Sequence, residues 1–152
     1  MAGWKQRLVE LGIELPAVAA PVAAYVPAVR SGAHVYTSGQ LPIVAGALAA
    51  TGKVGAEVSP EEAKRHARTC VLNGLAAIDA LVGLDSIVQV VKVVGYVASA
   101  DGFTGQPAVI NGASELLGEV FGEAGVHARA AVGVSELPLG APVEVELIVE
   151  IA

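Results

Sequence analysis

The sequence predicts an α+β fold in which two helices cover one face of a β-sheet. A strong helix start stands at Ser59, a second helical segment ends near Gly125, and strand-like segments precede, separate and follow the two helices. The resulting order is β-β-α-β-α-β-β, and two helices are too few to cover both faces of such a sheet. The uncovered face needs a partner, which a symmetric oligomer with its sheets turned inward would supply.

Composition limits the class of protein and the class of partner. The 152 residues fit one domain spanning 1–152, and although 54% of them are apolar, no apolar run reaches the ~18 residues of a membrane span. The net charge of −6, with nine Lys and Arg, argues against nucleic acid, which normally binds a basic patch. The single cysteine, Cys70, excludes an intramolecular disulfide and fits a reducing compartment. Because no secretory signal is evident either, we expect a cytoplasmic protein without a membrane or nucleic-acid partner.

The first third of the chain predicts short elements. Residues 4–11 have the apolar spacing of a short helix, whereas residues 15–29, rich in Pro and Ala, indicate extended or irregular chain. His34–Ser38 has the β-branched and aromatic content of a strand. Residues 41–55 are expected to form a loop that contains a second strand.

A long helix is predicted from Ser59 to about Leu81. Ser59 can cap its start, Pro60 suits the first helical position and Glu62 completes a capping box, while Gly83 would end it. Small residues recur with the helical period and predict close packing on a sheet; they are Ala63, Ala67, Cys70, Gly74 and Ala77.

The second half predicts a central strand, a second helix and a hairpin. Ile87–Val97 is apolar at both parities, so we expect it in the middle of the sheet, with Val91 and Val93 on the face that the helices leave open. A helix should run from about Pro107 to Gly125. Residues 130–135 and 143–151 would then pair with each other as a hairpin around the turn at 137–140.

Two charged residues of this predicted hairpin suggest chemistry on a small carboxylic acid. Arg129 stands at the start of its first strand, and arginine is well shaped to hold a carboxylate by two parallel hydrogen bonds. Glu146 lies in its second strand and could orient a water molecule. By residue type alone, ordinary alternatives stay open: a salt bridge for Arg129, and for Glu146 a solvated acidic face shared with Glu144 and Glu150.

No metal or cofactor is expected. The three histidines, His34, His66 and His127, lack the spacing of metal ligands, and we assign them to the surface or an interface. There is no glycine-rich phosphate loop and no nucleophile elbow.

Several segments, in order, resemble the RidA/YjgF family, the reactive intermediate deaminases also called L-PSP endoribonuclease-like proteins. The resemblance covers roughly residues 20–151. It is carried by Thr37–Pro42, Thr51–Val54, Leu72-Asn73, Val90–Lys92, Asn111, Ala128-Arg129, Leu137-Pro138 and Val143–Glu146.

The resemblance implies a chorismate-mutase-like fold of the bacillus type, with a mixed sheet, two helices on one face and ligand clefts between the subunits of a homotrimer. It implies cofactor-free hydrolysis of reactive 2-enamino and 2-imino acids to 2-keto acids and ammonia. In this scheme Arg129 holds the substrate carboxylate and Glu146 helps to position the water. The other substrate-binding positions carried over are Tyr25, Ser38, Gly39, Asn111 and Ala131.

Departures from the family pattern indicate a divergent subgroup. Around Tyr25 only the tyrosine is retained, Ala131 replaces a common cysteine, and His127 stands where proline is frequent. The loops at 43–50 and 102–108 look longer than usual. Two alternative functions therefore stay open. The chain could be a trimeric protein that binds or senses a small carboxylate or keto acid without turnover, or an endoribonuclease that inhibits translation. The acidic charge makes the endoribonuclease the least favoured.

Overall fold

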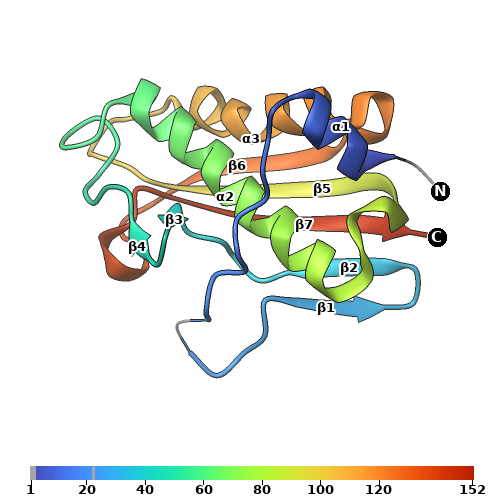
Figure 1. Ribbon diagram of the computed structural model, residues 1–152. Helices are drawn as coiled ribbons and strands as arrows, with labels where there is room; N and C mark the ends of the chain where they lie inside the picture. The colour runs from blue at the N-terminus through green and yellow to red at the C-terminus, as the bar shows by residue number, and fades with distance from the viewer. Residues whose placement is uncertain (1–2, 22) are drawn as a thin grey trace.

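The computed structural model describes residues 3–21 and 23–152, and it has the predicted α+β architecture (Figure 1). The main sheet has five strands in the order β1-β2-β7-β5-β6; the β5–β6 pair is parallel and the others are antiparallel, so the sheet is mixed. A second, two-stranded sheet joins β3 and β4. The elements are α1 (Trp4–Glu10), β1 (Ala28–Ser31), β2 (His34–Thr37), β3 (Ile43–Val44), β4 (Ala47–Leu48), α2 (Pro60–Val82), β5 (Ile87–Ala98), α3 (Gln106–Phe121), β6 (Ala128–Val134) and β7 (Val143–Ile151).

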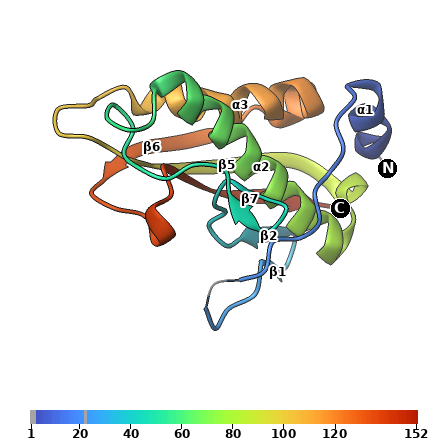
Figure 2. The ribbon, with the colours of Figure 1, turned by 60° about the vertical axis from the view of Figure 1, so that its left-hand side comes forward.

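Helices α2 and α3 lie side by side on one face of the sheet, as predicted (Figures 1 and 2). The Ser59 hydroxyl accepts a hydrogen bond of 3.1 Å from the amide of Glu62, which confirms the predicted cap of α2. A Cβ added at Gly74 would contact Leu147 of β7 at 3.0 Å, so the small-residue face of α2 allows the close approach to the sheet.

The N-terminal region differs from the prediction at two places. The second strand expected within residues 41–55 is two short strands, β3 and β4, which pair with each other outside the main sheet. Helix α1 is present, but the irregular segment ends at Pro27, and β1 pairs with β2 as a hairpin. Gly32, with a φ of 61°, supports the tight turn between them. Before β1, the chain crosses α2 on its way from α1 (Figure 1).

The predicted C-terminal hairpin is wrong, because β5 lies between the two strands. Strand β6 pairs with β5 in parallel, from Lys92 opposite Ala128 to Ala98 opposite Val134, and β7 pairs with the other edge of β5. The connection through residues 135–142 must span two strand spacings, about 10 Å in all, and it is long enough to do so. Strand β5 is interior, as its apolar residues at both parities predicted, but it lies next to the edge strand β6, and β7 is the middle strand of the sheet.

The placement of Val93 on the open face is also wrong. Register shifts between Ile87 and Gln89 and between Val90 and Lys92 interrupt the two-residue alternation of β5. As a result Ile87, Val90 and Val93 are all buried beneath the helices.

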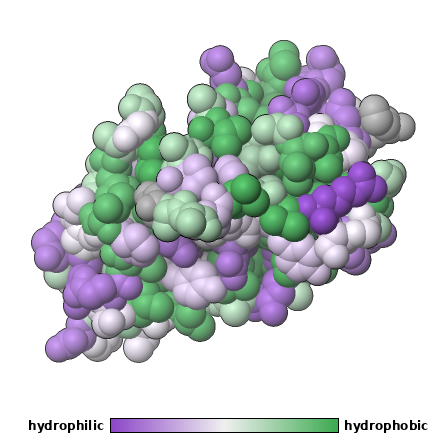
Figure 3. Space-filling model, turned by 90° about the horizontal axis from the view of Figure 1, so that it is seen from below, coloured by the Kyte–Doolittle hydropathy of each residue, from purple (hydrophilic) through white to green (hydrophobic). Residues whose placement is uncertain are grey.

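The face opposite the helices remains uncovered in one protomer. It carries the acidic row of β7 together with apolar and aromatic side chains from the flanking strands, of which Tyr36 and Val132 are 45% and 44% exposed. Seen from the β1 edge, apolar and polar side chains are interspersed (Figure 3).

Two glycines of α3 provide a test of the packing between the helices. A Cβ at Gly112 would collide with the backbone carbonyl of Lys64 in α2, whereas a Cβ at Gly118 meets nothing within 4 Å. Gly112→Ala should therefore lower the free energy of unfolding by about 1–3 kcal/mol. Gly118→Ala should raise it by about 0.5–1 kcal/mol, because alanine loses less entropy in a helix. Urea unfolding at one protein concentration measures both, and changes of the same sign would contradict the packing.

Candidate functional site

Arg129 lies on the edge strand β6 and faces α3. It is in register with the buried Val93, so its side chain leaves the sheet on the helix side. Its Nη1 donates to Asn111 Oδ1 at 2.8 Å and to Ser114 Oγ at 3.2 Å, and its Nη2 donates to the Pro107 carbonyl at 3.2 Å. Asn111 and Ser114 are one turn apart on α3 and therefore present both acceptors to the same guanidinium.

All three partners of Arg129 are neutral. Of the five N–H groups of a guanidinium, the three bonds leave two free, and within the described residues no carboxylate forms an ion pair with Arg129. The charge is thus oriented but not neutralised. A half-exposed guanidinium in this state is suited to bind an anion with a planar pair of oxygens.

Ser114 and His127 belong to the same cluster, and sequence reasoning missed both. His127 Nε2 lies 2.8 Å from Ser114 Oγ, and His127 Nδ1 lies 2.6 Å from the Gly125 carbonyl oxygen. The spacing gave a usable signal. Ser114 is three residues from Asn111 on a helix, and His127 is two residues from Arg129 at the start of a strand.

Glu146 lies on the opposite face of the sheet. It is in register with Val94, and its Oε1 accepts a hydrogen bond of 2.9 Å from the Tyr96 hydroxyl. Burial, together with this bond to Glu146, raises the pKa of Tyr96. Burial and the charge of Glu146 also raise the pKa of Glu144, so the two carboxylates repel each other on a half-buried surface.

Tyr25, Ser38 and Gly39 gather near the other edge of the sheet. Ser38 donates from its amide to the Pro27 carbonyl at 2.8 Å and from its hydroxyl to the Val26 carbonyl at 2.6 Å, which ties the turn after β2 to the chain before β1. Gly39 allows the Glu144 carboxylate to lie against the turn, because a Cβ there would displace that carboxylate.

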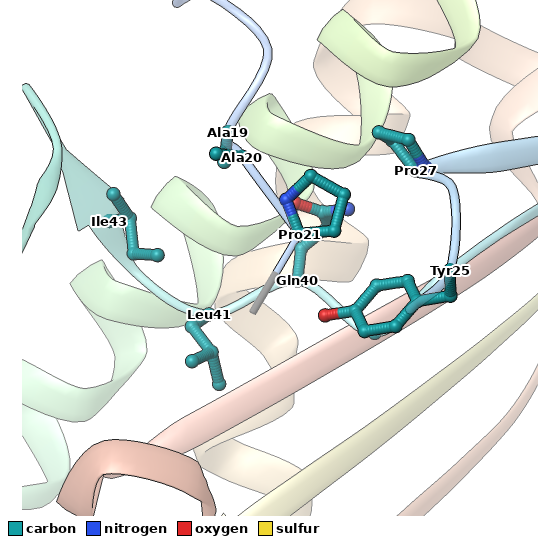
Figure 4. Close-up of a pocket in the computed structure, with 9 residues that line it drawn as sticks. Ala19, Ala20, Pro21, Tyr25, Pro27, Gln40, Leu41 and Ile43 are labelled. Atoms are coloured by element: carbon teal, nitrogen blue, oxygen red, sulfur yellow. The ribbon is translucent and has the colours of Figure 1, made fainter. Parts of the chain in front are cut away.

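Tyr25 and Gly39 line a narrow pocket with Gln40, Leu41 and Ile43 (Figure 4). Its volume is about 20 Å³, room for about one water molecule. A larger cavity of about 690 Å³ adjoins it, lined mainly by the apolar segment 16–21 and by Ile43, Ala45 and Gly46.

The predicted site residues therefore form separate groups. Arg129 and Asn111 are joined directly, and Ala131 lies two residues along the same face of β6, opposite Gly95. Glu146 and the Tyr25–Ser38–Gly39 group are not brought to Arg129 within one protomer, since β5 and the thickness of the sheet separate Glu146 from Arg129. A site that uses all of these residues needs a second copy of the chain.

The described residues contain no group of three or more His, Cys, Asp or Glu side chains that could hold a metal ion. Cys70 is fully buried, and this burial raises the pKa of its thiol well above the ordinary value, so it is not an activated nucleophile. Across residues 3–21 and 23–152, no helix is long and apolar enough to span a membrane.

A family model described as "YjgF/chorismate mutase-like, putative endoribonuclease" matches residues 5–151. The chain belongs to the YjgF/RidA family. Protein TCP17 of Trypanosoma cruzi is 47% identical over 148 residues, which cover 95% of this chain and 91% of TCP17. Membership confirms the resemblance and, with the observed sheet, the chorismate-mutase-like α+β fold.

Two solved structures place the chain within the family. A Shewanella oneidensis protein with the same endoribonuclease description is 34% identical, with a TM-score of 0.93 over 99% of this chain and 100% of its own. RidA of an Antarctic Psychrobacter species is 31% identical, but its TM-score is 0.62 over 88% of this chain and 94% of its own. At nearly equal identity, the chain is closer in structure to the Shewanella protein.

The paired carboxylates of β7 lead to a pH-dependent prediction. Because the pKa of Glu144 in the folded protein is raised above its ordinary value of 4.5, folding favours the protonated form, and this contribution to stability is lost as pH rises from 4.5 through the raised value. Glu144→Gln is neutral throughout and should stabilise the protein against urea at pH 7 but not at pH 4. Glu150→Gln, on the same face opposite His34, is the control. An equal gain in the free energy of unfolding at both pH values would show that repulsion between the charged forms of Glu144 and Glu146 does not destabilise the folded protein.

Proposed function

We propose that the protein is a cofactor-free hydrolytic deaminase that converts reactive 2-enamino and 2-imino acids to 2-keto acids and ammonia. The observation that carries the proposal is the state of Arg129: three neutral acceptors fix its guanidinium, and two N–H groups and the full charge remain for a ligand. A small carboxylate is the group that such a fork binds best. Membership of the YjgF/RidA family supports the same chemistry.

In the proposed mechanism, Arg129 binds and orients the carboxylate of the imine. A water molecule, held by Glu146 and a backbone carbonyl near Ala131, attacks the imine carbon and forms a carbinolamine. The first proton of the water passes to the imine nitrogen as the carbinolamine forms. The C–N bond then breaks as the carbinolamine hydroxyl gives up the second proton to the nitrogen, so ammonia leaves and a C=O bond remains. Because such imines already react with water, orientation of the two reactants is the main contribution required.

We further propose that the site lies between protomers of a homotrimer. Arg129, Asn111 and Ala131 would come from one protomer, and Glu146, Tyr25, Ser38 and Gly39 from its neighbour. Two structural features support this arrangement. The uncovered face of the sheet carries exposed apolar and aromatic side chains, and the edge strand β6 presents unpaired backbone groups next to Arg129.

The test of this function is ammonia release from enzymatically generated 2-aminoacrylate. Glu146→Gln should lower turnover by ~10²–10⁴-fold, the range of a group that positions or deprotonates water, and should leave the affinity for 2-oxobutyrate nearly unchanged. If wild-type protein binds keto acids but never accelerates ammonia release, the protein binds without turnover. RNA cleavage under the same conditions would favour an endoribonuclease instead.

Arg129→Lys tests the carboxylate anchor. Lysine keeps the charge but loses the two-pronged geometry, so binding of pyruvate or 2-oxobutyrate should weaken by about 1.5–3 kcal/mol, the worth of charged hydrogen bonds. Calorimetry measures the affinity, and Arg65→Lys, at an exposed position on α2, is the matched control. Equal affinity in wild type and Arg129→Lys would mean that Arg129 is not the anchor.

The oligomeric state is tested by light scattering coupled to size exclusion. The proposal predicts a mass near three times the 15.2 kDa of one chain. A stable monomer that still hydrolyses 2-aminoacrylate would exclude a site shared between protomers.

A further inference from the structure

The side chain of Arg129, two further side chains and one backbone carbonyl form a continuous line of hydrogen bonds. Arg129 Nη1 donates to Ser114 Oγ at 3.2 Å, Ser114 Oγ lies 2.8 Å from His127 Nε2, and His127 Nδ1 lies 2.6 Å from the Gly125 carbonyl oxygen. The family resemblance assigns a role to Arg129 and Asn111 but none to Ser114 or His127.

The Gly125 carbonyl determines the direction of this line. A carbonyl oxygen only accepts, so the hydrogen of the neutral imidazole must sit on Nδ1, which leaves Nε2 as an acceptor. The Ser114 hydroxyl therefore donates to His127, and its lone pairs turn toward Arg129. Gly125 itself packs closely against α3, because a Cβ there would collide with the Leu117 carbonyl.

We propose that Ser114 and His127 are positioning residues that fix the Arg129 guanidinium for its ligand. This inference rests on the proposed function only for the identity of that ligand, a small carboxylate. His127 need not touch the ligand. It acts by accepting the Ser114 proton, because a serine without that acceptor can rotate its hydroxyl hydrogen toward Arg129 and lose the bond. The pair thus gives a role to the histidine at a position where the family frequently has proline.

The first experiment uses the full-length protein without ligand. At about pH 8, where an ordinary imidazole is neutral, ¹⁵N spectra should show His127 with its hydrogen on Nδ1, its signals being those lost in His127→Phe. The order parameter of the Arg129 Nε–H should fall below about 0.6, the flexible range, in Ser114→Ala and in His127→Phe. An Nε2–H tautomer, or unchanged Arg129 order in both variants, would overturn the proposal.

The second experiment measures 2-oxobutyrate affinity by calorimetry. Ser114→Ala and His127→Phe should each weaken binding about tenfold, the loss expected for one hydrogen bond, and the double variant should be no weaker than either single one. Ser114→Thr keeps the hydroxyl and should restore affinity, while Glu115→Gln, whose carboxylate pairs with Lys64 outside the cluster, should have no effect.

Combining Ser114→Ala with Arg129→Ala distinguishes a failure of this inference from a failure of the proposed function. In an Arg129→Ala background, Ser114→Ala should cause no further loss of affinity, and a further tenfold loss would mean that Ser114 acts independently of Arg129. If Arg129→Ala itself leaves affinity unchanged, the proposed function fails, while the Arg129 order measured without ligand still decides whether Ser114 and His127 position it.

Discussion

The structure depends on a five-stranded sheet whose one face is sealed by α2 and α3. This constraint keeps β5 inside the sheet, between β7 and β6, because its buried side chains need cover from the helices and from neighbouring strands on both edges. It also divides the charged residues of the chain's last quarter. Arg129 leaves the sheet on the helix side, where α3 holds it, whereas Glu146 leaves it on the open side. A residue pair that is close in the chain is thus separated by the sheet.

Under the proposed function, this separation leaves the site incomplete in one protomer. A guanidinium held by three neutral acceptors has unused charge, and a row of half-buried carboxylates has unfavourable charge, with the pKa of Glu144 raised as a consequence. Within one protomer, no charge of opposite sign among the described residues pairs with the Arg129 guanidinium or with the carboxylates of Glu144 and Glu146. Under the proposed function, a neighbouring copy and a substrate carboxylate between them would complete both halves.

Most of the fold could be predicted from local signals in the sequence. The Ser59 cap, Gly83 and the small residues of α2 are short-range features whose physical effect is independent of the rest of the chain, and the structure confirms them. The wrong predictions concern long-range pairing. No local feature of residues 130–151 shows that β5 will insert between β6 and β7, and the register shifts that bury Val93 arise only from pairing with β7. For the same reason the resemblance predicts Arg129 and Asn111 together, whereas the spacing of Ser114 from Asn111 and of His127 from Arg129 does not by itself predict that they contact each other, because that contact depends on α3 packing beside β6.

Subunit mixing tests whether Arg129 and Glu146 act in one site contributed by two protomers. Arg129→Ala and Glu146→Gln proteins would each be assayed alone, then unfolded together, refolded and assayed for ammonia release from 2-aminoacrylate. Under random mixing in a ring, about a quarter of the sites would combine an intact Arg129 with an intact Glu146 of the neighbour, so activity should return to about that fraction of wild type. Mixed oligomers that form but remain as inactive as the separate variants would contradict a shared site.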